Sequence, residues 1–72
     1  MLEFLKDNAC RLCAGEYLRH NGIVYFIWGS ILGCRTISCA NENDFDNLDT
    51  IDLMFATKDV ARIDYTGKVI LM

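Results

Sequence analysis

The chain contains no proline, so no proline-rich linker divides its 72 residues and no proline marks a strand edge. Its longest apolar run, residues 23–28, is far shorter than the ~20 residues that a membrane-spanning helix needs, so we expect no membrane contact. Seven Lys and Arg stand against ten Asp and Glu, which gives a net charge of −3. Because phosphate backbones are bound by a basic face, nucleic acid is not the ligand that this composition predicts.

Motifs of common enzyme classes are also missing. The chain has no serine-nucleophile elbow, no phosphate-cradling glycine loop and no H-E-x-x-H motif. Its single histidine, His20, precedes the Asn21-Gly22 pair, where an exposed turn histidine is far commoner than a catalytic one. We therefore predict a protein without enzymatic activity, with no catalytic residue and no cofactor.

Residues 23–28, Ile-Val-Tyr-Phe-Ile-Trp, are the segment around which the rest of the chain is organised. Their β-branched and aromatic side chains are typical of a strand, and the run is too short for a buried helix. Successive side chains of a strand point to opposite faces, so Tyr25 shares one face with Ile23 and Ile27, and Phe26 shares the other with Val24 and Trp28. Both faces are apolar, so both must be covered.

Residues 2–14 carry the one clear helical pattern. Apolar side chains recur there at three- and four-residue spacing from Leu2 to Cys13, and Gly15 follows as a helix stop. The first residues also carry charges where a signal peptide has its apolar core. We therefore expect an N-terminal helix in a cytoplasmic protein whose cysteines are reduced.

The remainder predicts short antiparallel strands separated by turn residues. Asn21-Gly22 is a strong hairpin signal, and Gly29 and Gly33 indicate a bent second strand. The predicted strands lie at about residues 16–20, 23–32, 34–40, 50–56, 60–65 and 69–72. Strands this apolar are best buried in a small, mainly β barrel, a single domain over residues 1–72 with the helix capping one end. The main alternative is a second helix spanning residues 44–56, capped by Asp44 or Asp46.

This order of one helix and five or six strands resembles the Sm-like branch of the SH3-like small barrels. The matching residues are Asn21-Gly22, the segment Gly29-Ser30-Ile31-Leu32-Gly33 and the segment Lys58-Asp59-Val60-Ala61-Arg62-Ile63. RNA-binding members of the family have an aspartate and an asparagine shortly after the second glycine, where this chain has residues 35–38, Arg-Thr-Ile-Ser. The resemblance therefore implies the fold without the RNA-binding motif. In charge, this chain is more similar to acidic members of the family that act as protein inhibitors.

The four cysteines form two pairs, spaced C-x2-C (Cys10 and Cys13) and C-x4-C (Cys34 and Cys39). Four thiolates at such spacings can hold a zinc ion tetrahedrally. However, Cys10 and Cys13 lie within the predicted helix, and Cys39 falls on the same strand face as Ile37. We therefore favour buried cysteines that pack as small hydrophobic side chains, and keep a small zinc-stabilised domain as an alternative.

The most distinctive segment is acidic. Half of the ten carboxylates fall within residues 42–52, with no Lys or Arg among them. We predict that this segment docks on a partner, with two apolar anchors set among carboxylates. The candidate partner-binding residues are Glu42, Asp44, Phe45, Asp46, Leu48, Asp49 and Asp52. The simpler interpretation is a solvated loop.

These patterns together predict a non-enzymatic protein-binding module, a small acidic inhibitor or adaptor of the phage or mobile-element type. Its expected partner is a larger protein with a basic, nucleic-acid-binding surface. The alternative is an Sm-like single-stranded RNA-binding protein that uses Tyr25, Trp28 and Arg35. The apolar last strand, residues 69–72, further predicts a homo-oligomer, because an exposed strand edge pairs readily with a second copy.

Overall fold

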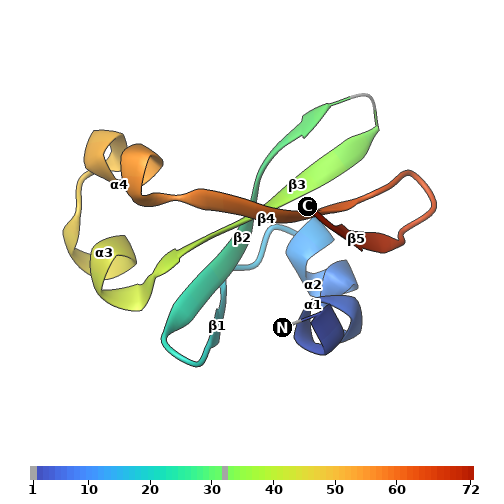
Figure 1. Cartoon of the computed structure of the whole chain (residues 1–72), viewed down its shortest axis with the longest axis horizontal. Coiled ribbons are helices and arrows are strands. Elements are labelled where there is room, and N and C mark those ends of the chain that lie inside the picture. The colour runs from blue at the N-terminus through green and yellow to red at the C-terminus, as the bar shows by residue number, and fades with distance from the viewer. Residues whose placement is uncertain (1, 32) are drawn as a thin grey trace.

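The computed structural model describes residues 2–31 and 33–72 and forms one antiparallel sheet with short helices at its two sides (Figure 1). The strands follow one another across the sheet in chain order: β1 (Leu18–His20), β2 (Ile23–Ile31), β3 (Cys34–Asn41), β4 (Lys58–Ile63) and β5 (Val69–Leu71). The helices are α1 (Leu2–Asp7), α2 (Ala9–Cys13), α3 (Glu42–Asn47) and α4 (Thr50–Ala56). The mainly β, antiparallel class is therefore as predicted. Leu32, the last residue of the predicted strand 23–32, lies outside the described residues.

The Asn21-Gly22 pair forms the predicted hairpin turn between β1 and β2. Both residues have positive φ, 50° and 78°, the conformation that a two-residue turn of this kind requires. The turn sets the register, in which Leu18 pairs with Tyr25. β2 then bends at a bulge between Ile27 and Gly29, which leaves Trp28 without a partner on β3.

The sheet does not close into the barrel that we predicted. Among the described residues β1 pairs only with β2, and β5 pairs only with β4. The N-terminal helices explain the opening, because Leu5 and Leu12 join a buried cluster that also contains Leu18 of β1 and Val69 of β5. Helices thus occupy the space between the two edge strands that a closed barrel would have used (Figure 1).

The predicted helix over residues 2–14 is two short helices that meet at Asn8. The Asn8 side-chain amide donates a hydrogen bond to the Phe4 carbonyl oxygen at 2.8 Å, and its backbone departs from helical geometry. Asparagine favours such local bonds over continuing a helix, which accounts for the break.

The predicted strand 50–56 is wrong, because these residues form α4, and the predicted loop before it contains α3. Side-chain caps start both helices: Asn41 accepts a hydrogen bond from the Asn43 N–H, and Asp49 accepts one from the Asp52 N–H, each at 2.8 Å. The alternative of a second helix spanning residues 44–56 is closer, although the segment forms two helices with a break at Leu48, and the proposed caps, Asp44 and Asp46, are not the residues that cap.

Each face of the sheet has its own apolar cluster. α1 and α2 cover the first face, where Tyr25 and Ile37 are buried. On the second face α3 and α4 contribute Phe45 and Leu53, which pack on Val24, Phe26 and Ala40. Both faces of residues 23–28 are therefore used for packing, as their composition predicted. None of the helices in the described part of the chain has the length and apolar character needed to cross a membrane.

Candidate functional site

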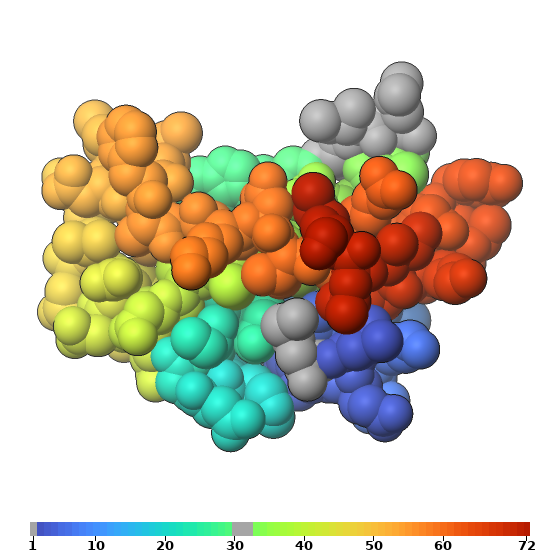
Figure 2. Space-filling view, viewed as in Figure 1, coloured from blue at the N-terminus to red at the C-terminus, as the bar shows by residue number. Residues whose placement is uncertain are grey.

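The predicted docking segment forms a helical unit, α3 and α4 with the link between them, which we call the acidic arm (Glu42–Ala56). It lies at one end of the molecule, beyond the β1–β2 turn and away from α1 and α2 (Figures 1 and 2). The Glu42 N–H donates a hydrogen bond to the Gly22 carbonyl oxygen at 2.9 Å, which ties the start of the arm to the β1–β2 turn. The arm is therefore an ordered surface rather than a solvated loop.

Two of the predicted carboxylates are already paired within the chain. Arg19 of β1 places Nη1 2.7 Å from Glu42 Oε1 and Nη2 2.8 Å from Asp46 Oδ1. These hydrogen bonds lower the pKa of Asp46 and raise the pKa of Arg19, because each charged form stabilises the other. Glu42 and Asp46 thus hold the arm to the sheet, and the single positive charge of Arg19 offsets the charge of one of these two carboxylates.

Asp44, Asp49 and Asp52 take part in no ion pair within the described residues. Asp49 has a second task, since its carboxylate caps α4. Asp49 and Asp52 are exposed, whereas Asp44 is half-buried. The negative charge that remains available to a partner is therefore concentrated around the first turn of α4.

The two predicted apolar anchors have different fates. Phe45 points inward, and its ring centroid lies 5.8 Å from that of Phe26. The Arg19 guanidinium lies over the Phe45 ring, with Cζ 5.7 Å from the ring centroid. Phe45 is therefore partly buried and packs against the apolar cluster of the second face. Leu48, in the link between the helices, is exposed as the prediction of an anchor requires.

Sequence reasoning missed the largest apolar surface of the arm. Ile51, Met54 and Phe55 of α4 are 67 %, 54 % and 86 % exposed, because the helix turns Leu53 toward the sheet instead. These residues belong to the segment predicted as a strand over residues 50–56. Their three- and four-residue spacing behind the Asp49 cap was the available signal for an amphipathic helix.

The cysteines do not assemble into a metal site. All four thiols are free, and no three His, Cys, Asp or Glu side chains of the described residues come close enough to hold an ion. Cys10 is exposed, whereas Cys39 is half-buried, and burial raises the pKa of its thiol. The zinc alternative therefore has no support in the geometry of Cys10, Cys13, Cys34 and Cys39.

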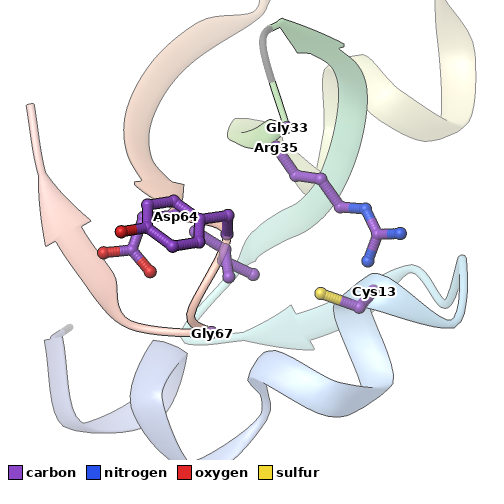
Figure 3. Close-up of a pocket in the computed structure, with 7 residues that line it drawn as sticks. Cys13, Gly33, Arg35, Asp64 and Gly67 are labelled. Carbon is purple, nitrogen blue, oxygen red and sulfur yellow. The ribbon is translucent and has the colours of Figure 1, made fainter.

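A cavity of about 350 Å³ lies between α2 and the β4–β5 turn (Figure 3). Arg35 and Cys13 line one side and Asp64 the other. Asp64 accepts hydrogen bonds from the Thr66 hydroxyl at 2.6 Å and from the Thr66 and Lys68 N–H groups, and these bonds lower its pKa. Asp64 is thus an ionised residue that shapes the turn, and not a carboxyl poised to exchange protons at neutral pH.

The residues of the RNA-binding alternative do not share a surface. Tyr25 is buried on the first face and packs against Phe4, whereas Trp28 packs against Phe26 of the second face. Arg35 lines the cavity beside α2. His20 stacks on Phe4 with ring centroids 4.1 Å apart, which gives it a packing role.

No protein-family model matches the chain, and comparisons with curated proteins and with solved structures find no match either. Its function must therefore be inferred from its own residues. Among them, the acidic arm combines ordered backbone, available negative charge and exposed apolar side chains.

Proposed function

We propose that this chain is a non-enzymatic protein-binding module, an inhibitor or adaptor that docks through its acidic arm on a basic surface of a larger protein. One observation carries the proposal. Asp49, which caps α4, and Asp52, in its first turn, lie close in sequence to exposed Ile51 and Phe55, and residues 36–57 contain no Lys or Arg. Carboxylates steer the encounter with a basic surface, and apolar side chains then supply contact area.

The partner class follows from the charge. Proteins that bind nucleic acid have basic surfaces built to receive phosphates, and a helix with carboxylates in its first turn offers them a competing anion. We therefore propose a nucleic-acid-binding protein as the partner. This chain would be a small protein of the phage or mobile-element type that occupies its basic surface. The resemblance to inhibitor-type Sm-like and SH3-like barrels is part of this proposal. It is supported by the N-terminal helical segment, the five antiparallel strands and the bend in β2.

The test begins with the immobilised chain and a host lysate, from which retained proteins are eluted with heparin, identified and purified. Association rates are then measured for the wild type and for the double variant Asp49→Asn, Asp52→Asn. Asparagine keeps the cap of α4. We expect the association rate to fall several-fold at low salt and the difference to shrink as salt rises.

The matched control is the double variant Glu3→Gln, Asp7→Asn, which removes the same charge from exposed positions on α1. It should associate at nearly the wild-type rate. Equal rates for the arm variant and the wild type, or an equal loss in the control, would contradict the proposal. Binding of labelled single-stranded RNA, with affinity that falls steeply with salt, would instead favour the Sm-like alternative.

A further inference from the structure

Within the part of the chain that the structure describes, the acidic arm packs on only one half of the second face of the sheet. The acidic arm packs on Val24, Phe26 and Ala40. Farther along the strands, one row of paired residues crosses the sheet from β2 to β5. In this row Gly29 pairs with Thr36, Thr36 with Arg62, and Arg62 with Ile70. We call this region, with Trp28 beside it, the open half of the second face. Trp28 is 46 % exposed, Arg62 is exposed, and Thr36 and Ile70 are half-buried.

The acidic arm, in turn, has apolar side chains on its outer side that nothing in the described chain covers. Its inner side chain, Leu53, packs on the second face, whereas Ile51 and Phe55 lie on the opposite side of α4 and contact no apolar cluster among the described residues. One molecule therefore has both a helix with an exposed apolar outer surface and a stretch of the same sheet face on which the acidic arm does not pack.

We propose that two copies of the chain pack second face to second face about a two-fold axis, so that α4 of each copy covers the open half of the other. In such an arrangement each contact is made twice and no binding surface is left over, which closes the assembly as a dimer. Phe55 and Met54 of one copy then pack on Trp28 of the other. Aromatic residues and Met are the side chains that interface cores favour.

Charge complementarity supports this occupant. Arg62 of the open half is in no ion pair within the described residues, and it would face the carboxylates of Asp49 and Asp52 of the other copy. The nearby Asp59 carboxylate accepts a hydrogen bond from the Ser38 hydroxyl at 2.9 Å, so it is already engaged. Direct packing of α4 on α4 would instead bring the Asp52 carboxylates of the two copies together, and their like charges would repel.

Association of two copies through a sheet edge would be weaker than packing of the two second faces. β1 and β5, the two edge strands, have only three residues each, and short edges offer few backbone hydrogen bonds to a second copy. The dimer we propose therefore differs from the edge-paired oligomer that residues 69–72 predicted. It also extends the proposed function, since the dimer covers Ile51 and Phe55 and would have to dissociate before the arm docks on another protein.

The test measures molar mass by sedimentation equilibrium from about 10 µM to about 1 mM chain, the range of a weak dimer. The wild type should pass from one chain to two. Phe55→Asp, at a position that contributes nothing to the core, should stay monomeric. Asp52→Arg and Arg62→Glu should each raise the dimer dissociation constant about tenfold or more, because each places like charges in both contacts.

An equimolar mixture of Asp52→Arg and Arg62→Glu should dimerise as well as the wild type. In that mixed dimer both contacts again join opposite charges, whereas neither variant alone can restore them. A wild type that is monomeric throughout overturns the proposal, as does a Phe55→Asp variant that dimerises normally. Failure of the mixture to recover also overturns it, since α4 would then pack on something other than the Arg62 face. None of these outcomes depends on the larger partner, so the proposed function is tested separately.

Discussion

Arg19 and Asp46 are 27 residues apart in the chain and joined by two hydrogen bonds in the fold, the shorter with Nη2 2.8 Å from Oδ1. The same guanidinium binds Glu42 and lies over the Phe45 ring. One side chain of β1 therefore fixes the position of α3, and through it the orientation of the helix that carries the exposed apolar residues.

This contact predicts a pH dependence. Arg19 lowers the pKa of Asp46 below its ordinary value of 3.8, so the folded chain binds the proton less readily than the unfolded chain does. The stabilisation is complete above that ordinary value and is lost as pH falls through the lower folded-state pKa. Free energies of unfolding of the wild type and Asp46→Asn, from urea titrations between about pH 7 and pH 2, should differ at neutral pH and converge in acid.

The control for this prediction is Asp46→Asn in an Arg19→Gln background. Without the guanidinium the substitution should change stability little at any pH. A difference between wild type and Asp46→Asn that stays constant down to the lowest pH would show that Arg19 does not set the acidity of Asp46.

Truncation of Phe26, which lies beneath the arm on β2, and of Phe55, on the exposed side of α4, should change the free energy of unfolding by different amounts. Phe26→Ala removes a fully buried ring of the second-face cluster and should cost about 3–5 kcal/mol of unfolding free energy. Phe55→Ala, at the most exposed apolar side chain of α4, should change it by less than about 0.5 kcal/mol when the chain is monomeric. Urea denaturation at low chain concentration measures both. A large loss for Phe55→Ala would mean that its side chain belongs to the core.

Ser38 is the one fully buried polar side chain among the residues whose burial the structure describes, and its hydroxyl donates a hydrogen bond to Asp59. Asp59→Ala should cost about 1–3 kcal/mol, because it leaves a buried hydroxyl without its acceptor. Adding Ser38→Ala should recover part of that loss, since no polar group is then left unpaired. A double-mutant cycle measures the coupling, and strict additivity of the two substitutions would contradict the prediction.

The thiols should differ in reactivity. Cys10 is exposed and should be alkylated first by iodoacetamide at about pH 8, whereas Cys39 should react roughly tenfold more slowly because burial raises its thiol pKa and restricts access. Peptide mass spectrometry after timed quenching gives both rates. Protection of Cys10, released by a chelator together with loss of folded structure, would instead point to a metal site.

Local signals determined much of the sheet. Asn21-Gly22 dictates a two-residue turn because both positions tolerate positive φ, and the run of β-branched and aromatic residues 23–28 fits no helix of ordinary length. The turn fixes the register, which pairs Leu18 with Tyr25, and the strand geometry makes Tyr25 and Phe26 face opposite ways. Each of these conclusions depends only on residues that are close in sequence.

Tertiary structure decided the acidic arm. Ile51, Leu53 and Phe55 alternate as in a strand, whereas Ile51 and Phe55 are also four residues apart as on one side of a helix, so the local signals conflict. In the fold β3 already pairs with β2 on one edge and β4 on the other, so a strand at residues 50–56 would have no place beside it. The Asp49 cap then favours a helix, and Arg19, far away in sequence, turns Phe45 inward. Long-range contacts alone left Ile51 and Phe55 on the surface, because sequence spacing carries no information about which side of a helix meets the sheet.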